Sequence, residues 1–486
     1  MKLSELLQGV SVVQATVDPN LEITGISYDS RTTKPGDLFV AISGFAADGH
    51  RFIPAARKAG AVAVLCEKAP KEAGPYLVTA SSRTALAQIS ANWFGHPADE
   101  MTMIGVTGTN GKTTVTYLLK TVLEQTIGAK VGLIGTIQNM IGDEILHTER
   151  TTPESYELQQ LFRQMKDAGC THVIMEVSSH ALVLERVAGI QFEIGIFTNL
   201  TQDHLDFHKT MEAYRDAKAM LFDRCRSGIV NLDDAATAHF LRTGTCDFTT
   251  YSVDRNDGEY LAKFLKLKSD RVEMDVVNGN EICRFELGIP GRFTVYNALA
   301  VIAAARKLGI PMEQSAAALR RAHGVKGRVE VVPTPGMPYT MLIDYAHTPD
   351  GLENVLRAVK GFCKGRLIAV FGCGGDRDPI KRPIMGRIGA EIADFVVVTS
   401  DNPRTEDPNA IIAQILEGMQ GSQTPYYVEE NRRKAIRWAM DHAEPEDIIV
   451  LCGKGHEDYQ IIGTEKTHLD EREEVAAHLE EIRQGR

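Results

Sequence analysis

Apolar runs of strand length alternate with stretches of helical periodicity along most of this 486-residue chain. The run MTMIGVTG is followed by a helical pattern, and VGLIGTI, THVIMEV and FEIGIFTNL continue the alternation. Strands that alternate with helices pair in parallel, and a parallel sheet needs apolar strands because both of its faces are covered. The pattern therefore predicts α/β domains whose ligands bind beyond the carboxyl ends of the strands.

The length of the chain and the positions of its glycine- and proline-containing segments indicate three such domains, since one domain takes roughly 100–200 residues. The first, 1–98, contains short strands in ISYDSR and DLFVAI and ends in the Gly- and Pro-containing NWFGHPADE. The second, 99–332, changes between about 228 and 290 to short alternating runs typical of antiparallel strands. The third, 333–486, follows a proline-rich linker and has apolar strands that end in polar loops.

Composition excludes several classes of protein. Lys and Arg total 53 against 64 Asp and Glu, a net charge of −11 that disfavours general binding to a nucleic-acid backbone. No apolar run approaches the roughly 18 residues of a membrane span, and MKLSELLQGV does not resemble a signal peptide. The eight cysteines lack CxxC spacing, which indicates reduced thiols. We expect a cytoplasmic protein with no nucleic-acid partner and no membrane insertion.

The segment GVTGTNGKTT, residues 105–114, lies between an apolar strand and a helix, as a phosphate-binding loop requires. Glycines let backbone N–H groups approach phosphates at the start of a helix. Lys112 supplies a charge for the β- and γ-phosphates and Thr113 a hydroxyl for Mg²⁺. The strict pattern has glycine where Val106 stands, so we expect Gly108 to make the turn. The candidate nucleotide contacts are Gly108, Thr109, Asn110, Gly111, Lys112, Thr113 and Thr114. A Gly-rich turn that merely connects strand and helix is the alternative.

Three further positions are candidates for chemistry. Glu176 ends the apolar run 172–177, where a carboxylate suits Mg²⁺, although a Glu paired with a base at the edge of the core is the alternative. His204 lies among two carboxylates and a second histidine in TQDHLDFH, which also suits a solvated loop. Lys218 lies in YRDAKAMLF, where helical periodicity alone predicts a surface lysine.

Taken in order along the chain, these motifs resemble those of the Mur ligase family. The set is YDSR, GTNGKTT, MEVSSHAL, TNLTQDHLDFH, YRDAKAMLF, VYNALA, GRVEVV, IDYAHTPDGL and DNPRTEDP, and it covers nearly the whole chain. The resemblance implies an N-terminal UDP-binding domain, a central P-loop ATPase domain with a parallel sheet, and a C-terminal Rossmann-like domain that binds an amino acid. It implies a monomeric enzyme of cytoplasmic peptidoglycan precursor synthesis, which serves cell wall biogenesis, cell shape and cell division.

The implied reaction uses ATP to convert the D-Glu γ-carboxylate of UDP-N-acetylmuramoyl-L-alanyl-D-glutamate into an acyl phosphate, which an amine then attacks. By resemblance, Lys112 is catalytic, Thr113 and Glu176 hold one Mg²⁺, and His204 holds a second together with a carbamylated Lys218. The resemblance also assigns adenine to Asn297 and the ribose and phosphates to Arg328, Asp344 and His347. Without the family, Asn297 is equally a helix cap.

The resemblance assigns the UDP-linked dipeptide to Ser30, Thr151, Thr152, Ser178 and Arg186. Leu184 stands where the family usually has a glutamine, so that contact departs from the pattern. The sequence TTPE at 151–154 also suits the start of a helix with proline at its first position.

The motif DNPR, residues Asp401, Asn402, Pro403 and Arg404, resembles that of family members that add meso-diaminopimelate. This amino acid has one carboxylate more than lysine, and a guanidinium fork binds a carboxylate in two places. The remaining implied contacts are Arg377, Gly453 and Glu457, the last for the distal ammonium. On spacing alone DNPR is an exposed turn.

Four other functions compete with diaminopimelate addition. A lysine-adding homologue would lack Arg404, and a folylpolyglutamate synthetase would lack YDSR and DNPR. A regulatory GTPase would carry an NKxD-type guanine motif, which we do not find. An inactive binding scaffold disagrees with intact Lys112, Glu176, His204 and Lys218.

Overall fold

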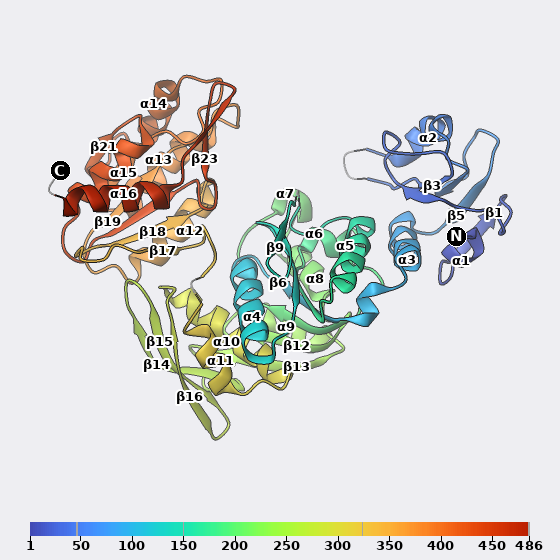
Figure 1. Cartoon of the computed structure of the whole chain (residues 1–486), viewed down its shortest axis with the longest axis horizontal. Helices are drawn as coiled ribbons and strands as arrows, with labels where there is room; N and C mark the ends of the chain where they lie inside the picture. Colours follow the sequence, from blue (N-terminus) through green and yellow to red (C-terminus); the bar gives the residue numbers. More distant parts are fainter. Residues whose placement is uncertain (45–46, 149, 323, 485–486) are drawn as a thin grey trace. The chain divides into compact units, whose positions relative to one another are not determined.

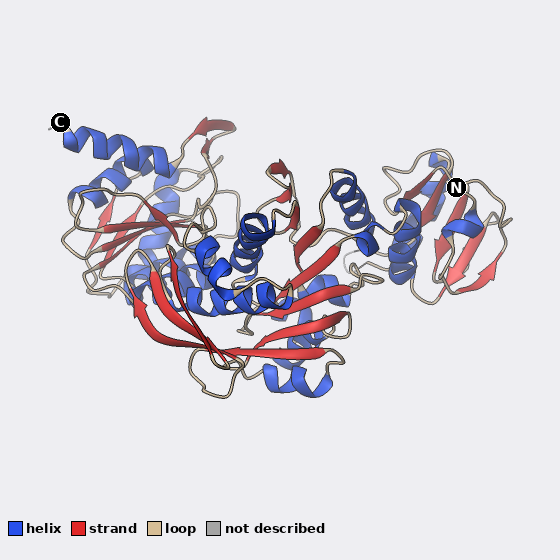
Figure 2. Cartoon of the chain, turned by 60° about the horizontal axis from the view of Figure 1, so that its bottom comes forward, coloured by secondary structure: helices blue, strands red, loops and turns tan. Residues whose placement is uncertain are grey.

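The computed structural model describes residues 1–44, 47–148, 150–322 and 324–484, in which the chain forms two units, Met1–Thr250 and Tyr251–Arg486. Figure 1 follows the elements in chain order, and Figure 2 shows strands flanked by helices in each sheet-containing part. The α/β fold that the strand and helix alternation predicts is confirmed.

The first unit begins with a five-stranded sheet in the order β1-β5-β4-β3-β2. Strands β2 to β5 pair in parallel and β1 pairs antiparallel with β5. The strands are β1 (Val12–Ala15), β2 (Gly25–Ser27), β3 (Asp37–Val40), β4 (Ala63–Cys66) and β5 (Tyr76–Thr79). The helices are α1 (Leu3–Leu6), η1 (Gly49–Phe52), α2 (Ile53–Ala59), α3 (Ser82–Phe94) and η2 (Pro97–Glu100). Apolar residues of β3, β4 and α3 form its core, which explains why these short runs fold as strands.

The same unit holds a second sheet, in which β6 pairs in parallel with β10 on one side and β11 on the other. Its strands are β6 (Thr102–Thr107), β7 (Val131–Ile134), β8 (Asn139–Ile141), β9 (Glu144–Leu146), β10 (His172–Glu176), β11 (Phe192–Phe197) and β12 (Cys225–Asn231). The helices are α4 (Lys112–Ile127), α5 (Ser155–Asp167), α6 (Ser179–Val183), α7 (Leu205–His208), α8 (Met211–Ala219) and α9 (Thr237–Thr243). The phosphate-binding loop after β6, Glu176 at the end of β10 and the segment TQDHLDFH after β11 therefore lie at the ends of neighbouring strands.

The second unit opens with three antiparallel strands, β14 (Tyr260–Leu267), β15 (Val272–Asn278) and β16 (Glu281–Leu287), each labelled in Figure 1. Helices α10 (Arg292–Lys307) and α11 (Met312–Leu319) follow. The expected antiparallel segment is confirmed for these strands but is wrong for β12, which pairs in parallel with β11. The end of β13 (Asp247–Ser252) also pairs in parallel, with the start of β14.

The remainder of this unit is a six-stranded sheet in the order β17-β18-β22-β19-β20-β21, parallel except for β17. Its strands are β17 (Glu330–Val332), β18 (Thr340–Asp344), β19 (Leu367–Phe371), β20 (Phe395–Val398), β21 (Tyr426–Val428) and β22 (Ile448–Cys452), and β23 (Tyr459–Ile462) with β24 (Glu465–His468) forms a separate hairpin. The helices are α12 (Pro349–Lys360), α13 (Lys381–Ile392), α14 (Pro408–Met419), α15 (Arg432–Asp441) and α16 (Glu471–Arg483). Apolar clusters on both faces bury the strands, as their unbroken apolar runs predict.

Within the described parts of the chain, none of the helices combines the length and the apolar character that a crossing of the bilayer demands.

We expect Ile104→Ala to lower the free energy of unfolding by about 2–5 kcal/mol, because its fully buried side chain lies in β6, between two paired strands. Ile145→Ala in β9 is the matched control: that side chain is 62% exposed, so its removal should change stability by no more than about 0.5 kcal/mol. Urea denaturation followed by circular dichroism measures both, and equal losses would contradict the placement of β6 at the centre.

Candidate active site

The predicted phosphate-binding loop lies between β6 and α4, as the motif requires. Gly108 has φ +144° and Gly111 φ +85°, conformations that favour glycine. A Cβ atom on Gly108 would lie 1.9 Å from Oγ1 of Thr198, so the close approach of that side chain also requires glycine there. Val106 is a paired residue inside β6, so the strand continues past the position of the strict motif's first glycine. Gly108 makes the turn, as expected.

The segment that follows β11 supports this loop. Thr198 donates through Oγ1 to the carbonyl of Asn110 at 2.6 Å, and Asn110 N–H donates to Oδ1 of Asn199 at 3.0 Å. Thr109 donates through Oγ1 to the carbonyl of Thr201 at 3.2 Å. The loop is thus held in shape by a second strand end before any ligand binds.

Two lysines share one carbonyl of the loop. Lys112 Nζ donates to the carbonyl oxygens of Gly108 at 2.9 Å and Thr109 at 2.8 Å, and Lys218 Nζ donates to that of Gly108 at 2.8 Å. Lys218 is only 1% exposed, so the surface position that helical periodicity predicts is wrong. Burial, and then the charge of Lys112, lowers the pKa of Lys218 well below its usual value.

Glu176 is the buried acceptor beside the loop, with 1% of its surface exposed. Thr113 donates through Oγ1 to Glu176 Oε1 at 2.9 Å. Thr136 donates its N–H to Oε1 at 2.9 Å and its Oγ1 to Oε2 at 3.0 Å. Hydroxyl and backbone donors therefore satisfy this carboxylate, in place of the basic side chain considered from the sequence. The hydroxyl and carboxylate oxygens of Thr113 and Glu176 are hard donors close together, and this donor set fits Mg²⁺.

His204 is the N-cap of α7 and has φ +52°, an uncommon conformation for a non-glycine residue. Its ring lies edge-on to that of His180, with centroids 4.9 Å apart, and 6.0 Å from the ring of Tyr214. Lys218 Nζ lies 4.4 Å from the centroid of the same tyrosine, so Tyr214 contacts both predicted ligands of the second Mg²⁺. Sequence reasoning did not select His180 or Tyr214, although each lies within a quoted motif.

In the described ranges (1–44, 47–148, 150–322 and 324–484), no group of three or more His, Cys, Asp or Glu side chains is arranged as a metal site.

The predicted dipeptide contacts surround the end of β10. Thr152 donates through Oγ1 to the carbonyl of Glu176 at 2.8 Å and accepts the N–H of Ser178 at 3.1 Å. Arg186 Nη1 donates to the carbonyl of Thr152 at 3.0 Å, and the hydroxyls of Thr151 and Thr136 lie 3.0 Å apart. Four predicted residues therefore meet beside the candidate Mg²⁺ ligands, namely Thr151, Thr152, Ser178 and Arg186.

The helix expected after TTPE is present, but it begins later than predicted. Glu154 occupies the N-cap and Ser155 is the first helical residue of α5, so Pro153 lies outside the helix and not at its first position. Glu154 also pairs with Arg83 at 3.3 Å and Arg186 at 3.4 Å, which anchors the predicted carboxylate-binding arginine. The sequence places this glutamate correctly at a helix start but not between two arginines.

Leu184 is the C-cap of α6, and its carbonyl accepts from Nη1 of Arg83 at 3.4 Å. Leucine provides no side-chain hydrogen bond at the position where the family usually has glutamine. Any contact to the dipeptide here must therefore be apolar or come from the backbone.

A cavity of about 480 Å³ lies near these residues and is lined by Tyr28, Arg150, Glu154 and Glu157 among others. Tyr28 donates its hydroxyl to Oε1 of Glu157 at 2.7 Å, and burial raises the pKa of this carboxyl group. Ser30 lies in the turn that follows Tyr28 and β2. The first residue of the YDSR motif, Tyr28, thus lines this cavity together with Glu157. Neither residue was selected from the sequence as a site residue.

In the second unit, Arg328 and His347 lie around Tyr345. The Arg328 guanidinium carbon is 5.9 Å from the Tyr345 ring centroid, and the His347 ring centroid is 4.6 Å from it. Asp344, the residue before Tyr345, accepts the N–H groups of Val329 at 2.8 Å and Ala346 at 2.9 Å, and burial raises the pKa of its carboxyl group. The structure therefore brings three predicted nucleotide contacts together.

Asn297 lies inside α10, not at its start, and is buried. Helix capping, the alternative for this residue, is therefore wrong.

The loops after β20 and β22 meet through a buried lysine. Lys454 Nζ donates to Oδ1 of Asn402 at 3.0 Å and to Oε2 of Glu457 at 3.4 Å, and Asn402 Nδ2 donates to the same Glu457 oxygen at 3.0 Å. Gly453 has φ +117°, and a Cβ atom there would lie 2.5 Å from Oδ2 of Asp401. Asp401, Asn402 and Pro403 are buried, so the exposed turn considered for DNPR is wrong.

Arg404 has φ +51°, and its Nη1 donates to the carbonyl of Gly375 at 2.9 Å. The segment 374–378 that contains Gly375 also carries Arg377, whose side chain is exposed and donates to the carbonyl of Asp376 at 3.0 Å. Two guanidinium groups therefore belong to adjoining loops at the carboxyl end of the sheet. Lys454, which holds Asn402 and Glu457, was missed from the sequence, although it stands between two selected residues.

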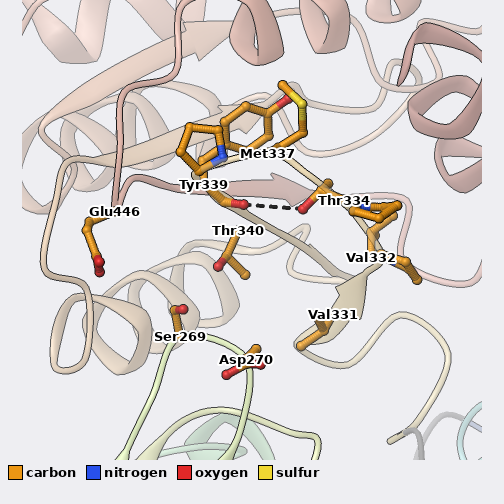
Figure 3. Close-up of a pocket in the computed structure, with 12 residues that line it drawn as sticks. Ser269, Asp270, Val331, Val332, Thr334, Met337, Tyr339, Thr340 and Glu446 are labelled. Atoms are coloured by element: carbon orange, nitrogen blue, oxygen red, sulfur yellow. Dashed lines mark hydrogen bonds between the residues drawn. The ribbon is translucent and has the colours of Figure 1, made fainter. Parts of the chain in front are cut away.

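A separate hollow of about 560 Å³ lies along the proline-rich segment 331–340 (Figure 3). Thr334 Oγ1 donates to the carbonyl of Tyr339 at 3.2 Å across this segment. Ser269, Asp270 and Glu446 supply its other polar side chains. The residues described as lining it include none of the predicted site residues, so it is not a candidate active site.

Comparisons with known proteins agree with this geometry. The Mur ligase family catalytic domain matches residues 22–96, the Mur ligase middle domain 106–305, and the Mur ligase glutamate ligase domain 327–455. A relative from Clostridium botulinum, named UDP-N-acetylmuramoyl-L-alanyl-D-glutamate–2,6-diaminopimelate ligase, is 47% identical over 95% of this chain and 96% of its own length. One of the same name from Caldanaerobacter subterraneus is 46% identical over 99% of both chains. A solved structure of that name has a TM-score of 0.75 at 30% identity and covers 99% of each chain.

We expect Gly108→Ala to abolish binding of a fluorescent ATP analogue, because the new Cβ atom would collide with Thr198 Oγ1 and distort the loop. Gly128→Ala is the matched control at the other end of α4. Its φ is also positive, at +64°, but no atom lies within 4 Å of the new Cβ atom. Fluorescence titration should show unchanged binding for the control, and equal losses in both variants would overturn the steric argument.

Proposed function

The chain belongs to the Mur ligase family, and we propose that it adds meso-diaminopimelate to the D-glutamyl γ-carboxylate of UDP-N-acetylmuramoyl-L-alanyl-D-glutamate with conversion of ATP to ADP and phosphate. The observation that carries the choice of amino acid is the position of Arg404. Its guanidinium donates to the carbonyl of Gly375 in the adjoining loop, at the carboxyl end of the C-terminal sheet. The near full-length relatives that bear this name support the same substrates.

We divide the work among three proposed domains, 1–98 for the UDP-muramyl group, 99–332 for ATP and 333–486 for the amino acid. The matched family segments and the separate apolar cores support this division.

In the first step a γ-carboxylate oxygen attacks the γ-phosphorus of ATP, and ADP leaves. The two reactants are both anions, so their approach requires positive charge. Lys112 and the N–H groups at the start of α4 supply it beside the γ-phosphate. In the second step the amine nitrogen bonds to the acyl carbon, phosphate departs and the nitrogen loses a proton. Arg186 holds the dipeptide in this scheme, together with Ser30, Thr151, Thr152 and Ser178.

Two Mg²⁺ sites belong to this proposal, and the ions would neutralise charge on the phosphates when bound. Thr113 and Glu176 would hold one, which their adjacent oxygens support. His204 and a carbamate on Lys218 would hold the other. The lowered pKa of Lys218 supports carbamate formation, because an unprotonated amine has the lone pair that bonds to the carbon of CO₂. Loss of one proton then leaves an anionic oxygen ligand in place of a cation.

For the nucleotide, we propose that Gly108 to Thr114 hold the phosphates, that Asn297 contacts adenine, and that Arg328, Asp344 and His347 contact the ribose and phosphates. For the amino acid, Arg404 and Arg377 suit the distal carboxylate and Glu457 the distal ammonium, with Asp401, Asn402, Pro403 and Gly453 around them. The runner-up is lysine, which would leave Arg404 without its carboxylate. A guanidinium fork left without its carboxylate partner disfavours the smaller substrate.

We place the enzyme in the cytoplasm as a monomer, at a step of peptidoglycan synthesis and hence of cell wall biogenesis, cell shape and cell division. The ATP and UDP-linked substrates of the proposed reaction support this location. The eight cysteines, all of which are free thiols in the described chain, agree with it.

The proposal is tested by phosphate release with ATP, Mg²⁺ and the UDP-linked dipeptide, with meso-diaminopimelate or L-lysine added in parallel. We expect strong stimulation by meso-diaminopimelate alone. Stimulation by lysine would keep the ligase chemistry and overturn the role of Arg404, and no stimulation by either would overturn the substrate assignment.

Arg404→Ala should lower kcat/KM for meso-diaminopimelate about 100-fold or more, because the distal carboxylate loses a charged partner with two donors. The exposed Arg387 of α13 provides a matched control, and Arg387→Ala should leave kcat/KM within about twofold, as expected for a surface site. Steady-state assays with varied amino acid measure both. An unchanged preference for meso-diaminopimelate over lysine in Arg404→Ala would refute the assignment.

In ¹³C-bicarbonate buffer, we expect a carbamate carbonyl signal in the NMR spectrum of the wild-type protein and none in Lys218→Ala. Lys120→Ala is the control, since Lys120 is also buried but its Nζ pairs with Glu124 at 2.7 Å. Its spectrum should match that of the wild type. A signal that survives in Lys218→Ala would place the carbamate elsewhere.

A further inference from the structure

We propose that Arg432 is a positioning residue that fixes the two loops of the amino-acid pocket relative to each other. The inference rests on the proposed function for the identity of that pocket. Arg432 is the first residue of α15. Its Nη1 donates to the carbonyl of Ser400 at 3.3 Å, its Nη2 to that of Cys452 at 2.8 Å, and its Nε to Oε1 of Glu471 at 2.8 Å.

The two carbonyls belong to the residues that immediately precede the two loops. Ser400 immediately precedes Asp401 of the DNPR motif, and Cys452, the last residue of β22, immediately precedes Gly453. Strand β19 lies between β20 and β22 in the sheet, so no ladder of backbone hydrogen bonds joins these strands directly. The fork of one guanidinium therefore bridges two loops that the sheet itself leaves unconnected.

Stability alone does not explain this arrangement. Both Arg432 and Glu471, the first residue of α16, are completely buried, and their closest nitrogen and oxygen are 2.7 Å apart. Burial removes water from both charges, and replacement of such a pair by apolar side chains is often neutral or stabilising. What an apolar pair cannot supply is two directed donors for two strand-end carbonyls. The geometry therefore favours placement of the loops as the role of the pair.

The contacts between the two loops show how a displacement of either loop would alter the amino-acid pocket. Asn402 and Glu457 belong to different loops, and both bind Lys454. Asn402 also accepts the N–H of Ile461 at 3.0 Å. If the loops separate, the proposed ammonium-binding carboxylate of Glu457 loses its fixed position. The affinity for the amino acid should then fall while the other substrates bind as before.

The experiment compares three variants of the full-length enzyme. Arg432→Met with Glu471→Leu removes both charges, and Arg432→Lys keeps the positive charge opposite Glu471 but has no fork to reach both carbonyls. The control is Arg366→Met with Asp447→Asn. That pair joins the residues before β19 and β22, at the opposite end of the same strands, with Arg366 Nη2 2.7 Å from Asp447 Oδ2. Asparagine keeps the acceptor for the backbone N–H of Arg366.

With ATP and the UDP-linked dipeptide saturating, we expect KM for meso-diaminopimelate to rise about tenfold or more in the first two variants, because a positioned pocket is lost. KM for the UDP-linked dipeptide should remain within about twofold, as should both values in the control. An unchanged KM for meso-diaminopimelate in folded Arg432→Lys would overturn the proposal. That variant also decides the matter if the double variant fails to fold.

Hydrogen exchange of the unliganded proteins separates this proposal from the proposed function. We expect segments 400–404 and 453–457 to exchange about tenfold faster in the Arg432 variants and at the wild-type rate in the control. Faster exchange in an enzyme that does not use meso-diaminopimelate would uphold the positioning role and reject the substrate. Unchanged exchange in both loops would reject the positioning role whatever the substrate.

Discussion

The buried carboxylate of Glu176 is the interaction on which the site in the first unit depends. It accepts hydrogen bonds from Thr113 of the phosphate-binding loop and from Thr136 after β7, while its own backbone carbonyl accepts from Thr152. An anion buried without such donors would be strongly destabilising, so the surrounding loops must converge on it. The side chain and backbone of one residue thus hold the predicted nucleotide contacts and the predicted dipeptide contacts together, which would place the two reacting anions of the proposed first step near the same charge-neutralising groups.

Much of this architecture follows from the sequence because parallel strands are buried on both faces and therefore appear as unbroken apolar runs. β6, β10, β11, β19 and β22 were all predicted on that ground and are present. The short hairpin of β8 and β9 was not, since three-residue strands leave almost no periodic signal. The parallel pairing of β12 was also missed, because an alternating pattern does not specify the direction of the partner strand.

The site was less predictable than the fold. Helical periodicity assigns Lys218 to the surface, but the group it contacts is the carbonyl of Gly108, 110 residues earlier in the chain. Spacing likewise suggests an exposed turn for DNPR, whereas the buried Lys454 from another loop holds Asn402 in place. In both cases the decisive contact is between residues distant in sequence. Resemblance to a family could select these positions, but only the folded chain shows which groups satisfy them.

Three buried basic side chains, those of Lys218, Lys454 and Arg432, share one arrangement. Each directs its donors at oxygen atoms of strand-end loops: the carbonyl of Gly108, the amide of Asn402, and the carbonyls of Ser400 and Cys452. Donors fixed in this way need not reorganise when charge develops during a reaction, which is the basis of electrostatic preorganisation. The net charge of −11 does not describe these sites, because interactions at a few ångströms in a buried setting outweigh distant surface charges that salt screens. An acidic protein can therefore bind anionic substrates, provided that its basic side chains are held where the strands end.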